Sequence, residues 1–225
     1  MPEAPPPHGS KSKAARRNSA EASSGQREIK KIRLQQSVLE LLKQGAGIHG
    51  VTMAQIAGAL GIDKSSVYHY YASKEDLFRE ALGNHLDAHM ARVDLALGPG
   101  EDFAGYTSRL VAEMVALWRS SGPLLLASAS LAATDAAQHA WEQQRIRGWS
   151  HALEAAARTA ADRGEIALPP DVPMAAAAAM WGAWGGCSAS IGHLEAYPPE
   201  QREAIVERLQ AVMVDSVRRA LGWRG

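Results

Sequence analysis

The chain has 225 residues but only one cysteine, two phenylalanines and no long, strongly apolar run. The single Cys187 excludes an internal disulfide, which favours a reducing compartment. No cationic residue lies close to Cys187 in sequence, so we interpret Cys187 as a small core residue rather than a redox-active thiol. The first 25 residues contain no apolar block, so we expect no secretory signal. The sequence therefore predicts a soluble, cytoplasmic protein.

Signals for β-strands are also scarce, because β-branched residues are few and no alternating apolar run is present. From Arg27 onward apolar residues recur at helical spacing, so the predicted fold is all-α with about nine helices. The Gly122-Pro123 pair predicts a break between two of these helices. The uncharged run 174–192 is mostly Ala and Gly, too weakly hydrophobic for a membrane span. It predicts a helix buried on most of its faces, and no membrane partner.

The formal net charge is zero, but the charges are unevenly distributed. Residues 1–74 hold 11 Lys and Arg against 5 Asp and Glu, and the remainder holds 13 against 19. A basic N-terminal third favours a polyanionic partner. Residues 1–26 are rich in Pro, Ser, Lys and Arg with almost no large apolar side chains, which predicts a disordered basic tail. The tail either contacts DNA phosphates or is a solvated leader.

Two short helical patterns lie on either side of Gly61. Thr52 and Gln55 form a capping-box pattern, which predicts a helix from Met53 to Leu60. Gly61 supplies the sharp turn, Asp63 is expected to cap a second helix, and Val67 should face the core together with Tyr70 or Tyr71. Two short helices joined by a tight glycine turn are typical of a helix-turn-helix, although many helical hairpins are only structural.

The polar residues of the second helix favour DNA over a purely structural hairpin. Lys64, Ser65, Ser66, Tyr68 and His69 would be exposed there, and all can bond phosphates or base edges. A second capping-box pattern at 73–76 places Lys74 at a helix N-terminus, where a phosphate can bind. Because a helix fits the major groove, double-stranded DNA is the expected partner.

The run GVTMAQIAGALGIDKSSVYHYYASKEDLFREAL, preceded by one amphipathic helix, resembles the DNA-binding region of the TetR family of bacterial transcriptional regulators. The resemblance covers roughly residues 29–82. It implies that Lys64, Ser65, Ser66 and His69 meet base edges. It also implies that Tyr68, Tyr70, Thr52 and Lys74 meet the DNA backbone. Asp63 stands where many members carry serine, which brings an anion near the DNA. The helix-turn-helix domain is placed at 27–73.

The family resemblance implies a helical ligand-binding and dimerisation domain, at 74–225. The sequence itself supports self-association, because the uncharged helix near 174–192 is followed by an amphipathic helix over 200–221. In a single subunit this pair would expose an apolar patch. We expect a homodimer with a four-helix interface that contains Trp181, Ile205, Leu209, Val212, Met213 and Val217.

Aromatic and sulfur-bearing side chains are concentrated in the middle helices, as in many small-molecule pockets. The alternative is that they only fill the core, which is the usual role of Trp and Met at helical spacing. Arg145, His139 and His193 could supply polar contacts to a ligand. The predicted pocket comprises Tyr106, Met114, Trp118, Trp141, Arg145, Trp149, Met180 and Trp184.

The sequence contains no nucleophile with its base, paired carboxylates or phosphate loop, so we expect no enzyme activity and no cofactor. His85 and His89 have metal-ligand spacing but lack a third ligand, so we predict an exposed pair and no metal site. The sequence predicts a ligand-responsive regulator, a repressor released from a palindromic operator by a small-molecule effector. The alternatives are a transcriptional activator and an architectural DNA-binding protein that senses no ligand.

Overall fold

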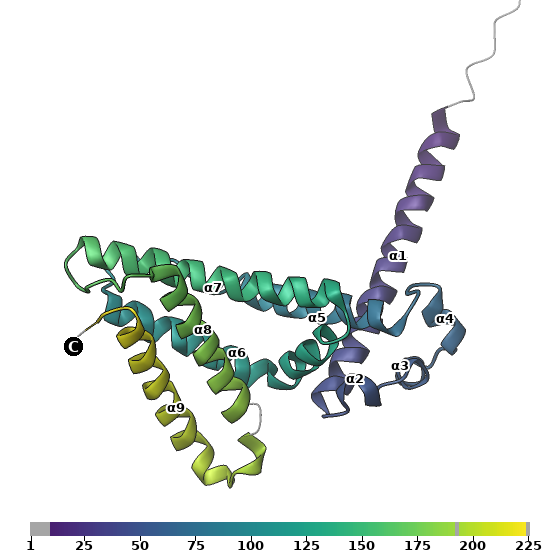
Figure 1. Cartoon of the computed structure of the whole chain (residues 1–225). Coiled ribbons are helices and arrows are strands. Elements are labelled where there is room, and N and C mark those ends of the chain that lie inside the picture. Colours follow the sequence, from purple (N-terminus) through teal and green to yellow (C-terminus); the bar gives the residue numbers. More distant parts are fainter. Residues whose placement is uncertain (1–9, 192–193, 224–225) are drawn as a thin grey trace, which may run out of the picture.

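The computed structural model describes residues 10–191 and 194–223, and within these ranges it contains helices and no strand (Figure 1). Nine α-helices and one 3-10 helix confirm the all-α prediction. Their bounds are α1 Ser10–Lys43, α2 Gly47–Gly50, α3 Met53–Ala59, α4 Lys64–Tyr68, α5 Lys74–Met90, α6 Phe103–Ala132, α7 Ala136–Asp162, α8 Val172–Ser190, η1 Leu194–Ala196 and α9 Pro199–Ala220.

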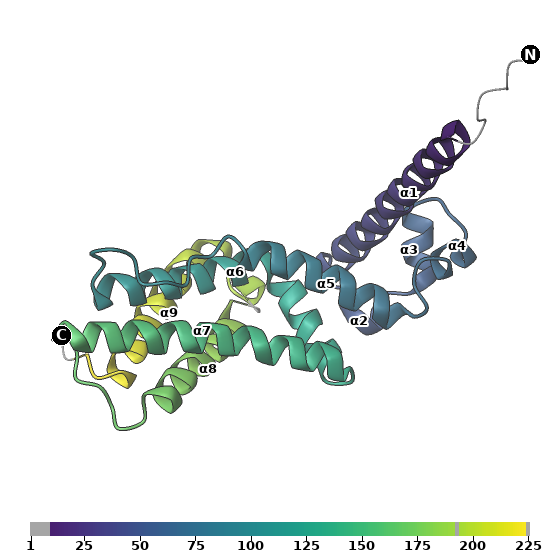
Figure 2. The same ribbon diagram turned by 90° about the horizontal axis from the view of Figure 1, so that it is seen from above.

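Helix α1 begins within the segment predicted to be a disordered tail. It runs from Ser10 through residue 26 without interruption, so the backbone there differs from the prediction, and residues 1–9 lie outside the described residues. Residues 10–26 contain four Ala, two Lys and two Arg, which favour helix without any burial. The N-terminal half of α1 projects away from the rest of the protein (Figures 1 and 2), since its sequence offers almost no large apolar side chains for packing.

The first of two hydrophobic cores holds together the second half of α1, helices α2 to α4 and the first half of α5, which we call the reading unit. Leu34, Val38, Ile56 and Val67 are almost fully buried in it. The core continues past the predicted boundary at residue 74, because the first half of α5 contributes the buried side chains Leu77, Phe78, Ala81 and Leu82. Three side chains of α6, Leu124, Ala127 and Leu131, complete it.

Helix α6 is continuous, so the predicted break at Gly122-Pro123 is wrong. A proline inside a helix removes one backbone hydrogen bond. Burial offsets that cost here: Leu124, just after Pro123, is buried in the reading unit, and Leu125 is buried in the second core. Helix α6 is long and apolar enough to cross a membrane by length and composition, yet 61% of its most apolar window is buried inside the protein. It is the central helix that joins the two cores.

The second core lies among the end of α5 and helices α6 to α9, which we call the body. Helices α8 and α9 lie side by side (Figure 1). Met213 and Val217 of α9, predicted at the dimer interface, are buried in this core, with Met213 Sδ 3.7 Å from Cys187 Sγ. The apolar stripe of α9 therefore packs largely within its own subunit, and these two side chains are not available to a partner.

Candidate functional site

The turn between α3 and α4 has the geometry that the sequence predicts. Both halves of the capping box form, with Gln55 N donating to Thr52 Oγ1 at 3.2 Å and Thr52 N donating to Gln55 Oε1 at 2.8 Å. At the other end Gly61 has φ +64°, a left-handed conformation that suits glycine. The Ile62 N–H donates to the Ala57 carbonyl at 3.0 Å, which makes the turn a Schellman motif. Helix α3 is thus fixed at both ends.

Helix α4 has one buried side chain, Val67, and is exposed on the opposite side. Val67 is fully buried against α3, whereas Lys64, Ser65, Tyr68 and His69 are exposed, with Tyr68 at 47%. We call these four exposed residues the reading face. Lys64 Nζ lies 5.9 Å from the Tyr68 ring centroid, so the cation and the ring lie close together. The reading face offers donors, acceptors and a positive charge, which suit phosphates and base edges in a major groove.

Three further predicted contact residues lie beside the reading face with less freedom. Ser66 and Tyr70 are half-buried, and Tyr70 faces Arg27 of α1, whose guanidinium carbon is 6.0 Å from the ring centroid. The Thr52 hydroxyl is exposed but already engaged in its capping box. Asp63 occupies the N-cap position of α4, but its side chain makes no cap hydrogen bond, in contrast to the expectation from sequence.

The Lys74 ammonium has a structural role that the sequence did not reveal. It is half-buried and donates to the Ile48 carbonyl at 2.9 Å and to the Val51 carbonyl at 3.3 Å. It also lies 5.4 Å from the Phe78 ring centroid. An ammonium has three N–H donors, so one remains for a phosphate. Lys74 joins α2 to the start of α5, and its DNA contact stays a prediction.

Sequence reasoning missed two other features of the reading unit. Arg27 Nη2 donates to the His69 carbonyl at 3.4 Å, which ties α1 to the end of α4. Buried Gln35 donates to the Tyr71 hydroxyl and to Glu80, both at 2.9 Å, and accepts from Asn84 at 3.0 Å. Burial raises the pKa of Tyr71 to about 12. The partners are 36 to 49 residues apart in sequence, so no local pattern signals them.

In the body, five of the eight predicted pocket residues line one cavity. They are Met114, Arg145, Trp149, Met180 and Trp184, and Ile146 completes the lining. The cavity has a volume of about 10 Å³, room for about one water molecule. The described conformation therefore has no room for an organic ligand at the predicted pocket.

The other three predicted pocket residues lie near the cavity or away from it. Trp118 packs edge-on against Trp184, with ring centroids 5.2 Å apart. Trp141 lies on the guanidinium of Arg145, 4.7 Å from its carbon. Tyr106 lies elsewhere and donates its hydroxyl to the Leu95 carbonyl at 3.1 Å, and burial raises its pKa. Tyr106 therefore fixes the loop after α5 and does not line the cavity.

Arg145 is the unusual residue of this cavity. Its side chain is only 7% exposed, and its guanidinium lies between the indoles of Trp141 and Trp184, 4.7 and 5.0 Å from their centroids. Its Nε and Nη1 have no hydrogen-bond partner among the described residues. The indole N–H groups of Trp118 and Trp149 are likewise buried without a partner. Burial lowers the pKa of Arg145, but a guanidinium stays charged at neutral pH.

A larger cleft of about 1060 Å³ separates the reading unit from the body. One wall consists of residues 42–50 at the end of α1 and in α2, and the other includes Trp118 and Pro123 of α6. Trp118 also touches Trp184, which lines the small cavity. The Trp118–Trp184 contact thus links a residue that lines the cleft to one that lines the cavity.

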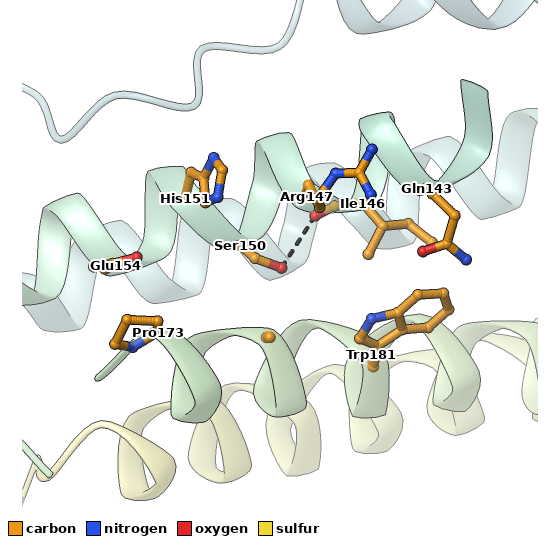
Figure 3. A pocket seen from close by; sticks show the side chains of 9 residues that line it. Gln143, Ile146, Arg147, Ser150, His151, Glu154, Pro173 and Trp181 are labelled. Carbon is orange, nitrogen blue, oxygen red and sulfur yellow. Dashed lines mark hydrogen bonds between the residues drawn. The ribbon is translucent and has the colours of Figure 1, made fainter. Parts of the chain in front are cut away.

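The outer face of α8 is uncharged and exposed. Met174 is 65% and Trp181 45% exposed, and the small residues at 178, 182, 185 and 189 are exposed beside them. Trp181 lines a shallow hollow of about 110 Å³ between α7 and α8, opposite Gln143 and Ile146 (Figure 3). On α9 Val212 is 62% exposed, while Ile205 and Leu209 are half-buried. Of the predicted interface residues, Trp181 and Val212 are thus the most accessible.

Comparison with known proteins gives consistent matches. Residues 40–81 match the model of bacterial regulatory proteins, tetR family. A search of curated proteins gives no match. Among solved structures, a transcriptional regulator from Rhodococcus sp. Rha1 is 20% identical with a TM-score of 0.66, covering 87% of this chain and 99% of that one. A protein from Saccharomonospora viridis in complex with choline is 16% identical with a TM-score of 0.69, covering 88% and 100%.

A third similar structure is the transcriptional regulator FadR from Bacillus subtilis in complex with stearoyl-CoA. It is 16% identical with a TM-score of 0.58, and the match covers 82% of this chain and 98% of that one. At these identities the structures establish the fold alone, over the 82% to 88% of this chain that they cover, whereas residues 40–81 carry the match to the family model.

Proposed function

We propose that this chain is a member of the TetR family of bacterial transcriptional regulators, and that it is a cytoplasmic repressor that a small molecule releases from a palindromic operator. The reading face is the observation that carries this proposal. Val67 and the two capped ends of α3 hold α4 in place, so its exposed polar residues are presented as one surface. The exposed polar side of a helix can enter the major groove of DNA and contact base edges there.

A homodimer would present two reading faces about 34 Å apart, one helical turn of DNA. The exposed, uncharged face of α8 supports such a dimer, since its small residues at 178, 182, 185 and 189 let another helix approach closely. Trp181 and Val212 would be buried against the partner. Val212→Asp is expected to convert the dimer to monomers in sedimentation experiments, whereas the exposed substitution Glu207→Asp should leave the dimer intact.

The effector would act through the two helices that belong to both cores. Helix α5 contributes Leu82 to the reading unit and Leu86 to the body, and α6 contributes to both around Pro123. The Arg79 guanidinium of α5 holds the carboxylate of Asp135, which caps α7, the helix that carries Arg145. A ligand that enters the cavity and moves α7 would therefore displace α5 and change the spacing of the two reading faces.

The DNA-binding part of the proposal is tested by affinity and specificity together. Fluorescence anisotropy should show a preference of ~10³-fold or more for the operator over random DNA. The double substitution Lys64→Ala and His69→Ala should abolish most of that preference. Arg208→Ala removes an exposed cation from α9 and serves as the control, with binding unchanged. Equal affinity for both DNAs would contradict the regulator and favour an architectural protein.

The ligand-responsive part has a separate test. By linkage, an effector that weakens operator binding must itself bind more weakly, by the same factor, when the operator is present. Operator affinity that stays unchanged at a saturating concentration of a bound effector would contradict induction. Repression is distinguished from activation by whether the operator overlaps a promoter, mapped from the DNA bound in cells.

A further inference from the structure

Arg145 is a buried cation whose Nε and Nη1 donate no hydrogen bond to any residue that the structure describes. Its closest carboxylate is that of Glu142, with Nη2 to Oε1 at 4.0 Å, beyond hydrogen-bond distance. Glu142 Oε1 instead accepts from Ser128 Oγ, which in turn accepts from Gln138 at 2.7 Å. The two indoles supply cation–π attraction but no acceptor for Nε or Nη1.

A buried charge without hydrogen bonds is expensive, so proteins normally pair such groups. Here the unpartnered atoms of the cavity lining are all N–H donors, namely Arg145 Nε and Nη1 and Trp149 Nε1. A further unpartnered donor, Trp118 Nε1, belongs to a residue that packs against the lining residue Trp184. A group with acceptors and a negative charge would complement them. The remaining wall is apolar and consists of Met114, Ile146, Met180 and the faces of Trp149 and Trp184.

We propose that the effector is an organic anion, a carboxylate on an apolar body, whose charged end binds Arg145 while its body lies among Met114, Met180 and the tryptophans. This inference rests on the proposed function, because it names the chemistry of the effector site. The planar guanidinium can hold a carboxylate with two parallel hydrogen bonds. The apolar body takes the space between α6, α7 and α8.

The same geometry disfavours a cationic effector. Trp141 and Trp184 flank the guanidinium as the walls of an aromatic cage flank a quaternary ammonium. The cage is thus already filled by a cation of the chain itself, and a second cation would be repelled.

The cavity must open to admit such a molecule. Methionine side chains repack easily, and Met114 and Met180 lie on opposite helices of the cavity. Separation of the Trp118–Trp184 contact would join the cavity to the cleft beside the reading unit. The entry of the anion is thereby adjacent to the DNA-binding core.

Calorimetric titration of the full-length, DNA-free protein tests this proposal with two matched sets of probes. One set is naphthoate, naphthamide and naphthyl-trimethylammonium; the other is octanoate, octanamide and octyl-trimethylammonium. In at least one set the carboxylate should bind the wild type most tightly. Arg145→Met should weaken carboxylate binding by about 10- to 100-fold, the effect of losing a charge-assisted contact, and change amide binding little. Arg145→Lys keeps the positive charge but lacks the planar pair of N–H donors, so its carboxylate affinity should lie between those of the wild type and Arg145→Met.

Arg147→Met is the control, because Arg147 is an exposed arginine of the same helix that lines the shallow hollow of Figure 3. It should bind the carboxylates like the wild type. Four results would overturn the inference. They are no carboxylate binding at millimolar concentration, equal binding by wild type and Arg145→Met, tighter binding of the ammonium probe, and loss of binding in Arg147→Met, which would place the anion in the hollow. Carboxylate binding through Arg145 with unchanged operator affinity would support the anion site and contradict induction.

Discussion

The reading unit and the body differ in how completely they satisfy their own polar groups. Among the described residues, the reading unit leaves one buried side-chain polar atom without a partner, Ser37 Oγ, whereas the body leaves four N–H donors. In the reading unit Gln35 bonds three side chains, and Lys74 bonds two carbonyls. The reading unit thus satisfies nearly all of its buried side-chain polar atoms without a ligand, while the body has unused donors at the proposed effector site. This difference suits a protein in which the body changes conformation when a ligand binds, while the reading unit keeps its internal contacts.

The largest effect should come from breaking the reading unit while leaving the body alone. Val67→Asp places a carboxylate in a fully buried position under α4, at a cost of about 3 kcal/mol or more. Operator affinity should fall by more than ~100-fold, the factor that corresponds to such a loss. All six tryptophans lie between residues 118 and 223, so their fluorescence reports on the body and should be unchanged. A changed tryptophan spectrum would show that the two regions do not fold separately.

Matched methionine substitutions in the two regions should have opposite consequences for stability. Gln35→Met removes the hydrogen bonds of Gln35 to Tyr71 and Asn84, while Glu80 keeps its ion pair with Lys31, and should lower the free energy of unfolding by about 1–3 kcal/mol. Arg145→Met removes a buried charge with unpartnered donors, so the ligand-free protein should be as stable as the wild type or more stable. Urea unfolding of both variants measures the difference. A stronger destabilisation by Arg145→Met than by Gln35→Met would contradict the comparison.

Lys74→Ala separates the structural role of this residue from its predicted DNA contact. Loss of the bonds to the Ile48 and Val51 carbonyls should destabilise the protein by about 1–2 kcal/mol. If the third N–H meets a phosphate, the slope of log affinity against log salt should also flatten by about one, alike for all DNA sequences. An unchanged slope with reduced stability would leave Lys74 only its structural role.

Two tyrosines three residues apart provide the next comparison. Tyr71→Phe removes a buried hydroxyl that accepts from Gln35 and should lower stability by about 1 kcal/mol with little effect on DNA affinity. Tyr68→Phe removes an exposed hydroxyl of the reading face, so stability should not change while DNA affinity falls. Thermal unfolding and anisotropy measure the two effects. Equal DNA affinity for wild type and Tyr68→Phe would remove the Tyr68 hydroxyl from the predicted contacts.

The smallest effect concerns pH. His85, expected from sequence to be exposed, is half-buried with Nε2 3.3 Å from Ser121 Oγ, and burial lowers its pKa from the ordinary value of 6.5. As the pH falls through about 6.5 the unfolded chain gains this proton more readily than the folded chain, so stability should decrease. Above that pH this group contributes no dependence. His85→Gln should weaken the decrease in urea unfolding measured across this range, and an identical pH profile would exclude His85 as its source.

Local sequence signals predicted the helix-turn-helix closely, because its determinants are local. Thr52, Gln55 and Gly61 act on backbone groups within a few residues, so a capping box and a left-handed glycine can be read from the chain. The start of α1 was predicted poorly for a different reason. The scarcity of large apolar side chains in residues 10–26 argues against packing, but helix formation by the Ala, Lys and Arg residues there does not depend on packing.

Features that depend on distant contacts could not be predicted in this way. Pro123 is a strong local break, yet the two cores on either side of α6 keep that helix intact. The pocket prediction included Arg145 as a polar contact, but its near-complete burial between Trp141 and Trp184 depends on how α7 meets α8. The carbonyl partners of Lys74 lie 23 and 26 residues away, so nothing beside it in sequence indicates them.

The most direct test of the central claim is to select the DNA that the protein binds from a random pool. The wild-type dimer should enrich two half-sites in inverted repeat, each read by one α4. Ser65→Arg, which adds a guanidinium to the reading face, should shift the preferred base, towards guanine, at the same position of both half-sites. Arg208→Ala should select the wild-type sequence. A pool without an inverted repeat, or a base preference that Ser65→Arg leaves unchanged, would contradict the claim that α4 reads the operator.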